Sequence, residues 1–113
     1  MRFNKRLVAA FKWCEAGRHR LHVYVMSGDG HTVKIGQSTN LDQRLACMRS
    51  HSGRNLRITF TYECVSSRQA NRIECAAHAL LKEYRVRGEW FRVSAAKAKA
   101  AVIEADKFAK LPG

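Results

Sequence analysis

The chain has 113 residues, which is enough for one domain and too few for two separate cores. Its hydrophobic fraction of 46% argues against an intrinsically disordered chain, and no apolar run approaches the roughly 18 to 20 residues of a membrane span. The 21 Lys and Arg against 9 Asp and Glu give a net charge of +12, which favours a polyanionic partner, most often nucleic acid.

The first part of the chain predicts a helix followed by a hairpin. Asn4 can cap a helix over about 5–16, which Gly17 ends. Residues 21–26 and 33–37 are rich in β-branched residues, and the Ser-Gly-Asp-Gly turn between them predicts an antiparallel hairpin. Lys12 and Glu15 interrupt the N-terminal apolar pattern, so we expect no signal peptide and a cytoplasmic protein.

The rest of the chain alternates helices with shorter extended segments. A strand is indicated at 56–64, where Leu56, Ile58, Phe60 and Tyr62 alternate and are expected to share one face. The remaining predicted elements are helices at 41–50, 67–84 and 95–110 and a short extended piece at 89–93. This order predicts an α+β fold, a small three-stranded antiparallel sheet flanked by helices. We expect three parts: an N-terminal helix and connector (1–20), a central domain (21–93) and a helix packed on it (94–113).

Several polar residues border the apolar faces of these elements. Glu74 and His78 are four apart on the long helix, beside its apolar stripe, and either form a half-buried ion pair or hold a cation. Arg44 lies at the edge of another apolar stripe and either pairs with an acid or binds an anion. Tyr24 and Lys34 face away from their apolar neighbours, and across the hairpin they form either a site or an exposed pair.

The order of these residues resembles the GIY-YIG nuclease superfamily, in particular a phage and bacterial branch. The resemblance covers about residues 21–93. It rests on His22-Val23-Tyr24, Lys34-Ile35-Gly36, Arg44, Glu74 with His78, and the segment Arg85-Val86-Arg87-Gly88-Glu89-Trp90-Phe91. Three positions depart from the superfamily's pattern. His22 replaces a glycine, Lys34 replaces a tyrosine, although lysine is usual in this branch, and Leu81 stands where an aromatic residue often follows the histidine.

The resemblance implies hydrolysis of a phosphodiester with one divalent metal, Mg²⁺ or Mn²⁺. It implies that Tyr24 is the general base, that Arg44 binds the phosphate and that Glu74 is the metal ligand. It also implies that His78 orients the nucleophile or binds phosphate. A free tyrosine is a poor base because its pKa is about 10. A lysine ammonium about 4 Å away could lower that pKa by roughly three units, so we expect Lys34 to assist Tyr24.

Four arginines complete the expected nucleic-acid contacts: Arg49, Arg72, Arg85 and Arg87. The expected partner is DNA, with RNA as an alternative, and no membrane is expected. A second copy or another protein could dock on the N-terminal helix. Two rival functions stay open: a non-catalytic nucleic-acid-binding module on the same fold, and a structural or partner-binding protein. We expect Glu89, Trp90 and Phe91 to shape the site and the core.

Overall fold

The computed structural model describes residues 20–28 and 31–109, so the predicted N-terminal helix lies outside the described residues. The helices are α2 (Leu41–Ser52), α3 (Ser67–Leu80) and α4 (Ala95–Ala109), with a 3₁₀ turn at Lys82–Tyr84. The strands are β1 (Leu21–Ser27), β2 (Val33–Ser38), β3 (Arg57–Cys64), β4 (Arg85–Arg87) and β5 (Trp90–Phe91). Within these described ranges, no helix has the length and apolarity needed to cross a membrane.

The fold is α+β, but its sheet has five strands rather than three, in the order β3-β1-β2-β5-β4. The predicted hairpin is confirmed, because β1 and β2 pair antiparallel from His22↔Ser38 to Ser27↔Val33. The two extra strands flank a turn at Gly88, whose φ of +54° is in the left-handed region that glycine tolerates. Strands of three and two residues are too short to show a period-2 pattern.

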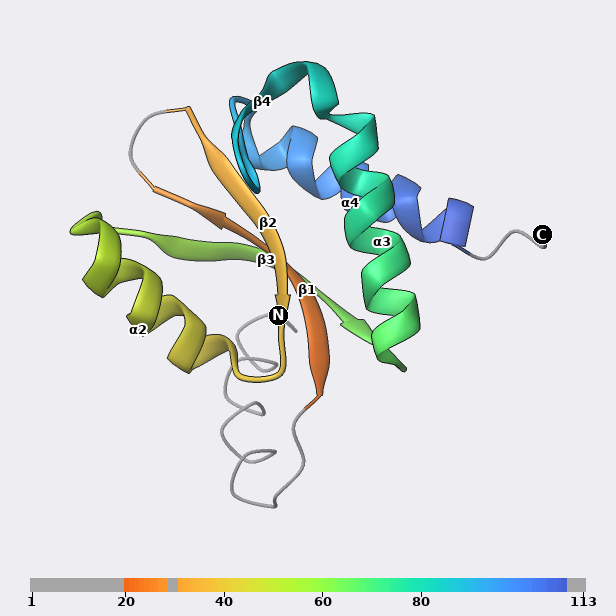
Figure 1. Cartoon of the computed structure of the whole chain (residues 1–113), viewed down its shortest axis with the longest axis horizontal. Helices are drawn as coiled ribbons and strands as arrows, with labels where there is room; N and C mark the ends of the chain where they lie inside the picture. Colours follow the sequence, from red (N-terminus) through yellow and green to blue (C-terminus); the bar gives the residue numbers. More distant parts are fainter. Residues whose placement is uncertain (1–19, 29–30, 110–113) are drawn as a thin grey trace.

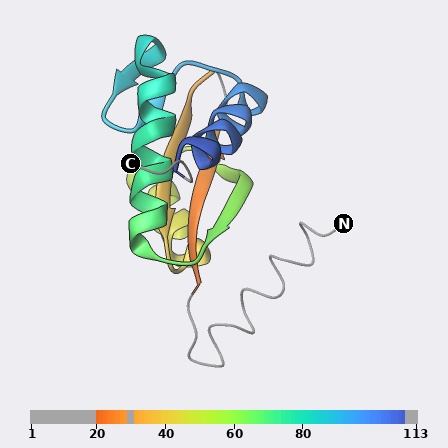
Figure 2. The ribbon, with the colours of Figure 1, turned by 90° about the vertical axis from the view of Figure 1, so that its right-hand side faces the viewer.

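Helices cover both faces of this sheet. Figures 1 and 2 show α2 on one face and α3 with α4 on the other. Strand β1, which lies between β3 and β2, contributes side chains to both cores. Val23 and Val25 pack with α3 and α4, whereas Tyr24 and Met26 pack with Leu41 of α2. Because successive side chains on a strand point to opposite faces, Tyr24 is carried on the α2 face.

The alternating apolar residues of the strand predicted at 56–64 do not share one face; they are Leu56, Ile58, Phe60 and Tyr62. Val25 pairs with Phe60, but Met26 pairs with Ile58, so a β-bulge inserts one residue between them. Ile58 therefore packs in the core under α2, whereas Phe60 packs against the core under α3 and α4. The expectation of one continuous apolar face was wrong because the bulge reverses the alternation.

Helix α3 ends at Leu80, four residues before the predicted end at Tyr84. Ile73, Ala77 and Leu81 are buried as expected, but Leu80 and Tyr84 are 43% and 38% exposed. The backbone of Arg92 donates a hydrogen bond of 2.8 Å to the Tyr84 carbonyl. The helix therefore ends at Leu80 because the following residues pair with the segment after β5. No proline or glycine at this position ends it.

Candidate functional site

The site is built over Gly36 of β2. Gly36 is paired with Tyr24 of β1, whose side chain is only 1% exposed. A Cβ on Gly36 would lie 2.7 Å from the Tyr24 hydroxyl and 3.2 Å from Oε1 of Glu89. The missing side chain thus leaves room for a phenol and a carboxylate to converge over one backbone position.

Helix α3 reaches the same place from the other face of the sheet. β5 pairs with β2 only at Val33 and Lys34, so no strand among the described residues pairs with this edge of β2 beyond Ile35. Gln37 Nε2 donates to Oε1 of Glu74 (2.8 Å) and to Oδ1 of Asn71 (2.7 Å). His78 Nε2 lies 2.9 Å from the Ile35 carbonyl oxygen, so Nε2 carries the proton in that hydrogen bond. These contacts hold α3 against the edge of β2.

Two carboxyl groups meet at this edge. Burial raises the pKa of Glu74, and the neighbouring charge of Glu89 raises it further, while a hydrogen bond from Gln37 opposes both. Burial also acts to raise the pKa of Glu89, but the hydrogen bond and charge of Lys34 outweigh it, so this pKa is lowered. The interaction between the two carboxyl groups raises the pKa of Glu74 and lowers that of Glu89, which helps to separate the two pKa values.

Lys34 does not act on Tyr24 as expected. Its ammonium donates to Oε1 of Glu89 at 2.6 Å. The register explains this, because Tyr24 is paired with Gly36 and Lys34 with Met26. Diagonal neighbours on one face are about 7–8 Å apart, which separates Lys34 from Tyr24.

The pKa of Tyr24 is raised to about 12, contrary to the expected lowering. Burial of the phenol is the main cause, because it disfavours the charged form. Arg44 acts in the opposite direction, and the charges of Glu89 and Glu74 add to the increase. The cation that acts on Tyr24 is therefore Arg44 on α2.

Tyr24, Arg44, Glu74 and Glu89 thus interact electrostatically although they come from four separate segments. Residues 21–106 of the chain match the family described as the T5orf172 domain. The chain belongs to the T5orf172 domain family. This is a phage-related, nuclease-like domain in the area of the GIY-YIG and HNH-like endonucleases. No curated protein and no solved structure matches the chain significantly.

The carboxyl pair in this T5orf172 domain offers ligands that suit a hard divalent cation. Mg²⁺ is usually held by one or two carboxylates, with waters and substrate phosphate filling the other positions. Across residues 20–28 and 31–109, no group of three His, Cys, Asp or Glu side chains could hold a metal ion. A cation here would therefore be held by Glu74, beside Glu89, and would depend on substrate to complete its coordination.

The four arginines expected to bind nucleic acid fall into two pairs. Arg49 Nε donates to the Leu56 carbonyl (2.8 Å), and Arg85 Nε donates to the Gly88 carbonyl (2.7 Å). Arg72 and Arg87 are exposed and have no side-chain partner in the part of the chain that the structure describes. The guanidinium N–H groups of Arg72 and Arg87 are therefore all available to bind phosphate.

Glu89 is the site residue whose position the sequence did not reveal. Its place in the Gly-Glu-Trp-Phe segment led us to expect that it shapes the site and the core, without indicating which residue it contacts. Glu89 is 55 residues from Lys34 in the chain, and they meet only because β5 pairs with β2. The sequence showed a carboxylate between a turn glycine and two aromatic residues, and this pattern does not indicate which residue the carboxylate contacts.

Proposed function

We propose that this T5orf172 domain is a metal-dependent endonuclease of the GIY-YIG type that hydrolyses phosphodiester bonds in DNA. The observation that supports this most is the convergence of a phenol, a guanidinium and a carboxyl pair at one open strand edge. Hydrolysis of a phosphodiester needs a base, a cation for the phosphate and a metal ligand near one another. The net charge of +12 suits a polyanionic substrate.

Each residue has a proposed part in the reaction. Arg44 contacts the non-bridging oxygens of the scissile phosphate, since a guanidinium can bind phosphate through two parallel hydrogen bonds. Tyr24, as its phenolate, accepts the proton of the attacking water, whose oxygen bonds to phosphorus while the P–O bond to the leaving strand breaks and the leaving oxygen takes a proton from solvent. Glu74 holds Mg²⁺ or Mn²⁺, which stabilises the negative charge of the reacting phosphate when bound. His78 keeps α3 on β2 so that Glu74 faces the site, and Lys34 keeps Glu89 beside it.

The second candidate is a nucleic-acid-binding module without catalysis. The raised pKa of Tyr24 favours it, because a phenol with a pKa of about 12 is a weak base at neutral pH. That value already includes the lowering by Arg44, and a cation held by Glu74 would lower the pKa of Tyr24 further. Metal-dependent activity therefore separates the two candidates.

The deciding experiment is a cleavage assay on supercoiled plasmid DNA, single-stranded DNA and RNA, in Mg²⁺, in Mn²⁺ and with chelator. The proposal expects nicking of DNA that needs the metal. Binding without cleavage under every condition would favour the second candidate. Cleavage that persists with chelator would contradict the role of Glu74.

Binding itself should depend steeply on salt. A protein that contacts six or more phosphates loses about 10³-fold in affinity between 50 and 200 mM salt. Arg72→Ala and Arg87→Ala should each reduce the slope of log affinity against log salt by about one. Filter binding or fluorescence anisotropy measures these slopes. Asn55→Ala, at an exposed uncharged residue, is the control, and an unchanged slope in both arginine variants would exclude them from the phosphate contacts.

The Lys34–Glu89 ion pair should act as one unit. Lys34→Met and Glu89→Gln should each slow cleavage, and the double variant should be no slower than the worse single variant. A double-mutant cycle on initial rates should then give a coupling of about 1 kcal/mol or more.

Because Arg44, rather than Lys34, is the cation that acts on Tyr24, Lys34→Met should lose the same factor in cleavage rate at neutral and alkaline pH. A smaller loss at alkaline pH would show that Lys34 lowers the pKa of Tyr24.

A further inference from the structure

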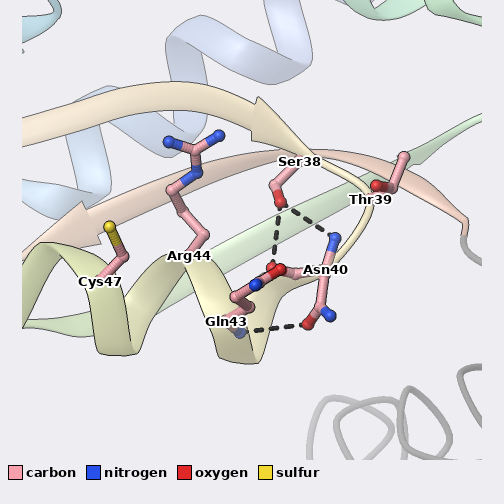
Figure 3. A pocket seen from close by; sticks show the side chains of 6 residues that line it. All are labelled: Ser38, Thr39, Asn40, Gln43, Arg44 and Cys47. Atoms are coloured by element: carbon pink, nitrogen blue, oxygen red, sulfur yellow. Dashed lines mark hydrogen bonds between the residues drawn. The ribbon is translucent and has the colours of Figure 1, made fainter.

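A polar cavity opens beside Arg44, where β2 turns into α2. Its volume is about 500 Å³, within the range of about 300–1,000 Å³ that is common for ligand pockets. Figure 3 shows its lining side chains, which are Ser38, Thr39, Asn40, Gln43, Arg44 and Cys47. None of the roles proposed above uses the cavity itself.

The wall of the cavity is held in shape by its own hydrogen bonds. Asn40 caps α2, because its side-chain oxygen accepts a hydrogen bond of 3.1 Å from the Gln43 backbone. Ser38 Oγ bonds both the backbone nitrogen and the backbone oxygen of Asn40 at 3.0 Å (Figure 3). Side chains fixed before binding lose less conformational entropy when a ligand enters.

The chemistry of the lining fits a nucleoside. The described residues that line the cavity combine hydroxyls, carboxamides and a thiol with one guanidinium, and none of them carries a carboxylate that would repel a phosphate group. The carboxamide of Gln43 is exposed and has no partner among the described residues, so its oxygen and its NH₂ are both available. A carboxamide can form paired hydrogen bonds with a base edge, and hydroxyls commonly contact sugar and phosphate.

Arg44 links the cavity to the reacting centre. Its charge acts on the Tyr24 hydroxyl, and its side chain also lines the cavity. In Figure 3 the guanidinium extends from α2 toward β2, along the side of the cavity opposite Asn40. Because Arg44 lines the cavity, a phosphate bound at its guanidinium would have its flanking nucleosides within reach of the cavity.

We propose that this cavity is the binding subsite for the nucleoside next to the scissile phosphate, and that Gln43 contacts the edge of its base. The subsite rests on the proposed function, because it takes the phosphate on Arg44 as the reacting one. In this proposal α2 determines which base is preferred next to the cleaved bond, and no additional recognition domain is needed for that preference.

Cys47 provides a direct test, because its thiol lines the cavity and is exposed. The Glu74→Ala variant is mixed with a short mixed-sequence DNA, as a single strand and as a duplex, and treated with N-ethylmaleimide. Peptide mass spectrometry then reads the alkylation rate of each cysteine. Bound DNA should slow alkylation of Cys47 by about fivefold or more, because a pocket ligand covers most of the lining. The buried Cys64 controls for unfolding.

The second measurement is base preference at the cut. Gln43→Ala should reduce the difference in kcat/KM among substrates with different flanking bases by about fivefold or more, the value of one paired contact. Asn55→Ala, an exposed amide outside the cavity, should leave it unchanged. Unchanged Cys47 alkylation on a DNA-bound protein would overturn the subsite while metal-dependent cleavage still stands. A protein that neither binds nor cleaves would overturn both proposals.

Discussion

Glu74→Ala is expected to abolish metal-dependent cleavage while the protein stays folded. Losing the proposed metal ligand removes charge stabilisation from the transition state, and a loss of about 10²- to 10³-fold or more in rate is the usual scale for such a group. Initial rates of plasmid nicking measure the loss. Mn²⁺ binding by calorimetry, in the presence of DNA, should weaken in parallel.

The fold should survive this change for two reasons. Burial and the charge of Glu89 already raise the pKa of Glu74, so removing its carboxylate relieves an unfavourable interaction. Gln37 keeps its second partner, because Nε2 also donates to Asn71. Thermal unfolding should therefore change little. Glu83→Ala, at an exposed carboxylate on the 3₁₀ turn, is the matched control and should retain full activity. Full metal-dependent activity in Glu74→Ala would refute its role.

Gly36→Ala is the second change expected to have a large effect. The new Cβ would lie 2.7 Å from the hydroxyl oxygen of Tyr24 and 2.9 Å from its Cζ, so the phenol ring must move. Overpacking of this kind costs about 1–3 kcal/mol in the free energy of unfolding. A displacement of about 1 Å in a catalytic group can cost about 10²-fold in rate, so cleavage should fall by that order.

Gly53→Ala separates the two effects of this substitution. Gly53 has a φ of +68° and nothing within 4 Å of its added Cβ, so alanine there meets backbone strain and open space. A left-handed backbone costs an ordinary residue about 1–2 kcal/mol, similar to the cost at Gly36. Chemical denaturation and nicking rates should show comparable destabilisation in both variants but lost cleavage only in Gly36→Ala. Equal activity in both would mean that the position of Tyr24 does not matter for the reaction.

The sequence alone was sufficient for the elements whose signals lie within one turn or one strand. The hairpin of β1 and β2 follows from alternating apolar residues around a glycine-rich turn, and the structure confirms it. The helices predicted to begin at 41, 67 and 95 do begin there, and Asn40, Ser66 and Ser94 each accept a backbone hydrogen bond from the first turn. These features are local, since each is decided by residues at most a few positions apart.

The candidate site was accessible to sequence reasoning only in part. Tyr24, Arg44 and Glu74 could be chosen because each is a polar residue bordering an apolar face, and they do interact in the folded chain. The partner of Lys34 could not be chosen in this way. Its ion pair with Glu89 depends on the β2–β5 register, which two-residue strands do not reveal in their own pattern.

Periodicity, turn residues and caps thus determined where most of the chain is helical or extended, which faces are apolar, and which polar residues border them. The tertiary structure alone decided the β-bulge that reverses the alternation in β3, the early end of α3, strand β4, and the pairing with β2 of the extended piece predicted at 89–93. It also decided the direction of the Tyr24 pKa, because desolvation depends on what packs around the phenol. Local patterns carry no information on such contacts, since burial and charge pairing arise between segments far apart in the chain.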